Sequence, residues 1–145
     1  NDEVQHLFVD SAPFAEKSFA QQAGLGWIGK NKLLISPVFG SFCYIGVLLI
    51  NKEMTYDKPM QSRCGSCSRC IETCPTKALN YEVLDARSCI SYLTLETKSK
   101  ISETLKLHLS GYVKGCDICA DICPWNIKYS KQHVHKELNP TPEIF

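Results

Sequence analysis

The chain has 145 residues, enough to bury a hydrophobic core but short for two independently folding domains. Its formal net charge of +1 lacks the basic excess typical of proteins that bind nucleic acid through charge. No apolar stretch approaches the roughly twenty residues of a membrane span and no signal peptide is recognisable, so we expect no membrane association and a cytoplasmic location.

The first half of the sequence predicts strands, one helix and a glycine-dense loop. Three apolar runs predict strands, at residues 6–9, 32–36 and 42–50, the last two joined by a turn. A helix is expected over 11–23, with Ser11 as its N-cap and Gly24 as its terminator. The glycine-dense loop follows at 24–31. Because the sequence opens on Asn1 rather than Met, we expect a segment of a longer protein.

The second half is rich in cysteine. A polar link over 51–63 leads into it, and apolar residues recur at helical spacing over 85–96 and 102–109. Four cysteines follow the pattern C-x2-C-x2-C-x3-C-P, namely Cys64, Cys67, Cys70 and Cys74, before Pro75. A partial second run, C-x2-C-x3-C-P, contains Cys116, Cys119 and Cys123, and Cys89 lies between the two runs. Eight thiolates are what two four-iron clusters require.

The spacing also predicts how the ligands divide. Three closely spaced cysteines wrap one cluster, while the fourth, before the proline, ligates the neighbouring cluster. Cluster one is therefore assigned to Cys64, Cys67, Cys70 and Cys123. Cluster two is assigned to Cys74, Cys89, Cys116 and Cys119, with Cys89 replacing the missing first cysteine of the second run. The ninth cysteine, Cys43, lies in an apolar run and is expected to be buried and inert.

Zinc and disulfides are the competing explanations for these cysteines. Structural zinc prefers two separated C-x2-C pairs and has no use for a third cysteine at the same spacing before C-P. A disulfide framework suits a small secreted chain, and nine is an odd number of cysteines. The pattern favours iron–sulfur clusters over both.

Further stretches carry a resemblance to a known family. They are V-D-S-A-P at 9–13, A-G-L-G-W-I-G-K at 23–30, D-A-R-S-C-I-S-Y-L-T at 85–94, G-C-D-I-C at 115–119 and C-P-W-N at 123–126. Over about residues 8–127 the chain resembles the epoxyqueuosine reductases. These enzymes are similar in chemistry to reductive dehalogenases, which also pair two four-iron clusters with a cobalamin.

The resemblance implies an α+β fold. Residues 1–60 would be part of a cobalamin-binding, nitroreductase-like α/β domain, and 61–127 a bacterial-ferredoxin-like domain with two 4Fe-4S clusters. Residues 128–145 would form a polar tail leading to a further segment. Family chains begin well upstream and continue downstream, so this chain is expected to supply one side of the corrin pocket and to be inactive alone.

The implied activity is reduction of epoxyqueuosine to queuosine in the tRNA anticodon loop. Electrons from a donor such as a flavodoxin or ferredoxin would pass through both clusters to cobalamin. Asp10 matches the family's proton donor, and the local alternative is that it caps the following helix. Lys30, Ser91 and Asp117 match positions near the corrin, with surface exposure or packing as the plain alternatives.

Two other functions stay open on the sequence. A pure electron carrier would pass electrons without chemistry of its own, but a simple ferredoxin does not need the strand, helix and glycine loop of residues 6–50. A dehalogenase-like relative would use the same cofactors on another substrate, such as an organohalide.

Overall fold

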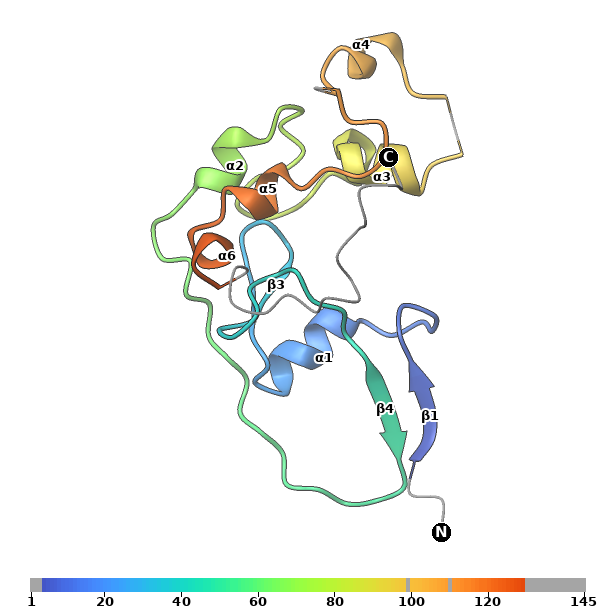
Figure 1. Ribbon diagram of the computed structural model, residues 1–145, viewed down its shortest axis with the longest axis vertical. Coiled ribbons are helices and arrows are strands. Elements are labelled where there is room, and N and C mark those ends of the chain that lie inside the picture. The colour runs from blue at the N-terminus through green and yellow to red at the C-terminus, as the bar shows by residue number, and fades with distance from the viewer. Residues whose placement is uncertain (1–3, 99, 110, 130–145) are drawn as a thin grey trace, which may run out of the picture.

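The computed structural model describes residues 4–98, 100–109 and 111–129. Eleven short elements follow one another in the described chain: β1 (Val4–Phe8), α1 (Glu16–Gln22), β2 (Trp27–Ile28), β3 (Leu34–Ile35), β4 (Val47–Ile50), α2 (Arg69–Thr73), the 3-10 helix η1 (Ala86–Ser88), α3 (Ile90–Leu95), α4 (Glu103–Lys106), α5 (Ile118–Asp121) and α6 (Pro124–Tyr129). The helices of the cysteine-rich half gather at one end, the β1–β4 pair lies at the other, and α1 lies between them (Figure 1). Mixed helix and strand confirm the expected α+β class.

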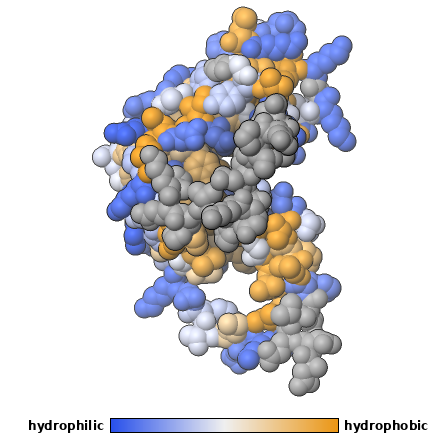
Figure 2. Space-filling view, viewed as in Figure 1, coloured by the Kyte–Doolittle hydropathy of each residue, from blue (hydrophilic) through white to orange (hydrophobic). Residues whose placement is uncertain are grey.

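The outer sheet is an antiparallel pair of β1 and β4, in which Leu7 faces Leu48 and Phe8 faces Val47. Phe8 turns toward the start of α1 and contacts Phe14, with ring centroids 5.5 Å apart. Leu7 and Leu48 share the opposite face and are 63% and 59% exposed. Figure 2 shows the apolar surface that gathers over this pair.

The inner sheet pairs β2 with β3, so that Trp27 faces Ile35. Both side chains are fully buried and pack with Cys123 from the far end of the described chain. The strands expected over 32–36 and 42–50 are shorter than predicted, and although a turn joins them they do not pair with each other. A bridge between Ser36 and Gly40 closes the turn, and the chain then leaves this sheet so that β4 can pair with β1.

The first helix is shorter than expected. It begins at Glu16, and its N-cap is Ala15 rather than Ser11. Proline disfavours the helical conformation in the residue before it, so Pro13 keeps Ala12 out of a helix. Residues 11–15 instead make a turn in which the Phe14 amide donates to the Ala12 carbonyl at 2.7 Å. Gly24 ends the helix with a φ of +70°, as expected.

The helix expected over 85–96 is divided in two at Cys89. This residue has extended backbone angles (φ −75°, ψ 123°), ending η1 and preceding α3. The break turns Cys89 away from a continuous helical face. Over 102–109 only α4 is helical, and Ser102 caps it by accepting from the Leu105 amide at 3.3 Å.

No helix in the described part of the chain is long and apolar enough to cross a membrane. The polar link of residues 51–63 runs along the outside of the molecule, from β4 to the cysteine-rich end (Figure 1). Most of the predicted polar tail, residues 130–145, lies outside the described residues.

Candidate metal centre

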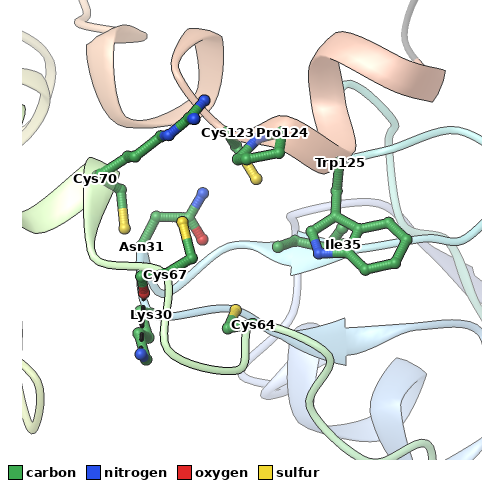
Figure 3. Close-up of a pocket in the computed structure, with 10 residues that line it drawn as sticks. Lys30, Asn31, Ile35, Cys64, Cys67, Cys70, Cys123, Pro124 and Trp125 are labelled. Atoms are coloured by element: carbon green, nitrogen blue, oxygen red, sulfur yellow. Dashed lines mark hydrogen bonds between the residues drawn. The ribbon is translucent and has the colours of Figure 1, made fainter.

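Four thiols converge on one pocket at the junction of the two halves. The cysteines that line it are Cys64, Cys67, Cys70 and Cys123. Figure 3 shows their sulfur atoms facing a shared space, with Ile35 and Trp125 forming an apolar wall. These are the four residues predicted to ligate cluster one, so the structure brings that set together.

Electrostatic interactions identify the same group. The pKa of the Cys70 thiol is raised, first by burial and then by the negative charges of Cys123, Cys64 and Cys67. Cys123 comes 53 residues after Cys70 in the sequence, yet its charge raises the pKa of Cys70 more than the charge of Cys64 or Cys67 does. The proline-linked cysteine of the second run thus completes the first set, as the spacing predicts.

The remaining four cysteines form a second group around Cys119. Burial, and after it the charges of Cys116, Cys70, Cys89 and Cys74, together raise the pKa of Cys119 to about 12. Cys116 has a raised pKa for similar reasons, with burial the largest and with the charges of Cys89 and Cys74 contributing. The predicted cluster-two residues are therefore neighbours, although they come from three separate segments of the chain.

Cys74 differs from the others because its sulfur accepts several hydrogen bonds. Burial alone would raise its pKa, but donors from Leu79, Thr76 and Ala78 outweigh burial, and the pKa is lowered. The hydroxyl of Thr76 lies 3.7 Å from Sγ. Hydrogen bonds to a ligating sulfur are one of the features that set a cluster's reduction potential.

The arrangement suits a cluster better than a single ion. A zinc ion holds its thiolates about 2.3 Å from one point, whereas each thiolate of a four-iron cluster bonds to a different iron and stands further from its neighbours. Throughout the described ranges, no three His, Cys, Asp or Glu side chains are placed to hold one metal ion. Four thiols that line one shared pocket from different sides fit an iron–sulfur cluster.

The glycine-dense loop supports both cysteine groups, a role that its sequence did not reveal. Lys30 Nζ donates to the carbonyls of Gly65 and Cys67, at 2.8 and 2.9 Å. The buried Asn31 donates from Nδ2 to the Cys119 carbonyl at 3.3 Å, while its Oδ1 accepts from the Leu33 amide. One loop therefore holds the peptide segments of two cysteine runs.

The glycines of this loop allow close packing within the chain itself. A Cβ on Gly26 would lie 2.4 Å from the Ile35 carbonyl oxygen, and one on Gly29 would lie 2.6 Å from the side chains of Asn31 and Ile35. Contacts of this kind leave no room for a side chain. Close packing within the chain therefore explains why glycine occupies positions 26 and 29.

Thr94 is a second supporting residue that sequence reasoning missed. Its hydroxyl donates to the Ile90 carbonyl at 2.8 Å within α3 and accepts from the Gly115 amide at 2.9 Å. This bond fixes the residue immediately before Cys116. A threonine in a helix gives no local signal of a partner 21 residues away.

The residues expected near cobalamin lie at separate places. Asp10 follows β1, is exposed, and has a φ of +53°. It does not cap α1, which begins six residues later, so that alternative is wrong. Ser91 is half-buried in α3, and the exposed Asp117 precedes α5. Lys30 lines the cluster-one pocket, and a role for these four residues at cobalamin stays a prediction.

Cys43 is exposed, so the expectation of a buried thiol is wrong. It lies between the Ser36–Gly40 bridge and β4, where the chain crosses from one sheet to the other. Among the described residues it is not one of the thiols that line the pocket or act on Cys119.

Comparison with known proteins agrees with this geometry. Residues 63–126 match a family model described as a 4Fe-4S double cluster binding domain. An epoxyqueuosine reductase from Cellulophaga algicola is 43% identical over 138 residues, which cover 94% of this chain and 45% of that protein. This chain belongs to the epoxyqueuosine reductase family. The expected double-cluster domain is thereby confirmed.

Solved epoxyqueuosine reductases share the fold. A crystal structure with a tRNA-Tyr epoxyqueuosine-modified stem loop is 34% identical with a TM-score of 0.89, covering 97% of this chain and 38% of that one. The epoxyqueuosine reductase from Bacillus subtilis was solved with its aspartate-bearing catalytic loop swung out of the active site. It is 32% identical with a TM-score of 0.86, and the match covers 99% of this chain and 38% of that one. The chain thus spans less than half the length of these relatives.

Proposed function

We propose that the protein to which this chain belongs reduces epoxyqueuosine to queuosine in the anticodon loop of tRNA. The observation that carries the proposal is the division of eight cysteines into two adjacent groups within an epoxyqueuosine reductase sequence. A solved relative with an epoxyqueuosine-modified stem loop supports tRNA as the substrate.

The reaction fixes what the site must supply. Removing the epoxide oxygen as water consumes two electrons and two protons and leaves a carbon–carbon double bond. The electrons would come from a reduced flavodoxin or ferredoxin, and the two cysteine groups are the predicted ligands of the clusters that carry them. Cobalamin, when bound, would supply a strongly reducing cobalt centre. Since cluster ligands must remain thiolates, we place the protein in the reducing cytoplasm.

Asp10 is the residue we assign to the proton that the departing oxygen needs. A carboxyl group keeps its proton near neutral pH only when it is desolvated or close to another negative charge. Asp10 is exposed in this structure, so the rest of the longer protein, the cofactor or the substrate would have to cover it. Its left-handed backbone, tolerated by aspartate, holds it in the turn after β1.

Three further residues are assigned to the cobalamin side of the site. Ser91 and Asp117 adjoin the cluster-two cysteines Cys89 and Cys116, and would contact the corrin there. Lys30 is assigned to the same cofactor from the glycine-dense loop. In this division residues 1–60 belong to the cobalamin domain, 61–127 to the double-cluster domain, and 128–145 lead onward.

The test is nucleoside analysis of tRNA from a strain that lacks the gene and any second epoxyqueuosine reductase. The full-length gene should restore queuosine, whereas its Asp10→Asn variant should accumulate epoxyqueuosine with both clusters retained. Cys43→Ala is the matched control and should restore queuosine fully. If the deletion strain makes queuosine normally, the proposal is wrong, and an electron carrier or a reductase of another substrate is favoured.

A further inference from the structure

Lys30 joins the glycine-dense loop to the peptide that wraps the cluster-one pocket. Its ammonium donates to the carbonyls of Gly65 and Cys67, which lie 35 and 37 residues further along the chain. Lys30 is one of the residues that line the pocket formed by the four thiols, and its Nζ is turned toward the Cys67 carbonyl (Figure 3). A positive charge is therefore fixed beside the group that would hold the first cluster.

The surroundings of Lys30 limit how far water can screen this charge. The side chain is half-buried, and the Tyr81 ring lies over Nζ with its centroid 5.3 Å away. Arg69 also lines the pocket, but it is exposed, so water and salt screen its charge more strongly. The Lys30 charge is the better placed of the two to act on the cluster.

Lys32, which lies just after this loop and before β3, provides a natural comparison. Its ammonium also donates to two backbone carbonyls, those of Tyr81 at 3.3 Å and Glu82 at 2.9 Å. Among the described residues that line the thiol pocket, Lys32 does not occur. The two lysines thus make similar bonds and differ in where they place their charge.

We propose that Lys30 is a positioning residue that raises the reduction potential of cluster one. Reduction adds one negative charge to a cluster that four thiolates already make negative, and a fixed cation beside it stabilises the reduced form. Net charge and solvent exposure are established determinants of cluster potential. This inference rests on the cluster-one ligands assigned above, and it is independent of cobalamin and tRNA.

The experiment is a redox titration of the anaerobically purified, iron-loaded protein, followed by electron paramagnetic resonance. The cluster-one step is first identified as the step that Cys64→Ser alters. Lys30→Gln keeps a hydrogen-bond donor but removes the charge, Lys30→Arg keeps the charge, and Lys32→Gln removes a charge outside the pocket.

Lys30→Gln should lower the cluster-one midpoint by a shift equivalent to about tenfold in the one-electron equilibrium, or about 59 mV. Lys30→Arg and Lys32→Gln should leave it near the wild-type value, and the cluster-two step should move less in all three. An unchanged midpoint in Lys30→Gln would overturn the proposal, as would an equal shift in Lys32→Gln.

Loss of cluster-one iron from Lys30→Gln but not from Lys30→Arg would also overturn it, since Lys30 would then be a clamp for the loop. Because the titration needs neither substrate nor cobalamin, its outcome is separate from the tRNA assay. If Cys64→Ser altered neither step, the ligand assignment itself would be at fault.

Discussion

Cys70 and Cys119 belong to different groups of thiols, yet the charge of Cys70 raises the pKa of Cys119. Cys70 lies in α2 and Cys119 in α5, and these two helices pack against each other. The packing brings a ligand of each predicted cluster to the same place. Two clusters held there would be neighbours, which suits the passage of electrons from one to the other.

Thr94 should control how firmly the second cluster is held. Thr94→Val keeps the shape of the side chain but removes the acceptor of the Gly115 amide, while Thr94→Ser keeps it. A partly buried donor left unpaired costs up to about 1–3 kcal/mol, so a chelator should remove the iron of cluster two about tenfold faster from the valine variant. Equal rates of iron loss in the valine and serine variants would contradict the role given to the hydroxyl.

Replacing Asn126 should lower the free energy of unfolding more than replacing an exposed asparagine that makes the same number of hydrogen bonds. It is fully buried, accepts from the Ser41 amide at 2.7 Å and donates to the Ala120 carbonyl at 2.9 Å. Asn126→Ala leaves both partners unpaired and should lower the free energy of unfolding by about 2–4 kcal/mol.

Asn80→Ala is the control for this substitution. Asn80 accepts from the Glu82 and Val83 amides in an exposed turn, where water can replace it. Its loss should cost about 1 kcal/mol or less. Anaerobic unfolding in guanidinium measures both variants, and equal midpoints would contradict the importance of the buried contacts.

Gly26 should tolerate no side chain. In Gly26→Ala the new Cβ would lie 2.4 Å from a backbone oxygen of β3, whereas in Gly46→Ala the nearest atom is 3.9 Å away. Overpacking of this kind costs about 1–3 kcal/mol, so Gly26→Ala should melt at a lower temperature and Gly46→Ala close to wild type. Thermal unfolding of the two alanine variants measures this difference, and equal melting temperatures would contradict the close packing at Gly26.

The metal-free protein should show two very different thiols. Alkylation requires the thiolate, so a lowered pKa makes Cys74 react at lower pH than an unfolded cysteine peptide. The raised pKa of Cys119, about 12, should keep that thiol protonated and slow until strongly alkaline pH. Mass spectrometry of the alkylated peptides across pH measures both midpoints, and identical values would show that this environment does not exist.

The cysteine groups could be predicted because cluster chemistry imposes its own spacing. Three cysteines at two-residue intervals and a fourth before proline need no knowledge of the fold, and the structure brings together both predicted sets. The break at Cys89 could not be predicted in the same way. Apolar residues recur through 85–96 at helical spacing, and only the need to place a thiol beside partners from other segments explains the extended residue.

The pairing of the strands and the residues that support the cysteine segments could not be predicted from the sequence, because both depend on contacts between distant parts of the chain. Residues 32–36 and 42–50 are close in sequence and joined by a turn, but β4 pairs with β1, whose residues lie 39 to 46 positions earlier in the chain. Asn31 and Asn126 act through partners 88 and 85 residues distant. Nothing in their local sequence indicates such partners, because the contacts are created by the folded chain.

The most direct test is an iron anomalous diffraction map from crystals of the iron-loaded protein. We predict eight iron sites in two groups of four, consistent with a double 4Fe-4S domain. Cys123 Sγ should bond to the group that holds Cys64, Cys67 and Cys70, and Cys74 Sγ to the other. Cys74 and Cys123 bonded to one and the same group, or a single metal ion in the thiol pocket, would contradict the division of ligands.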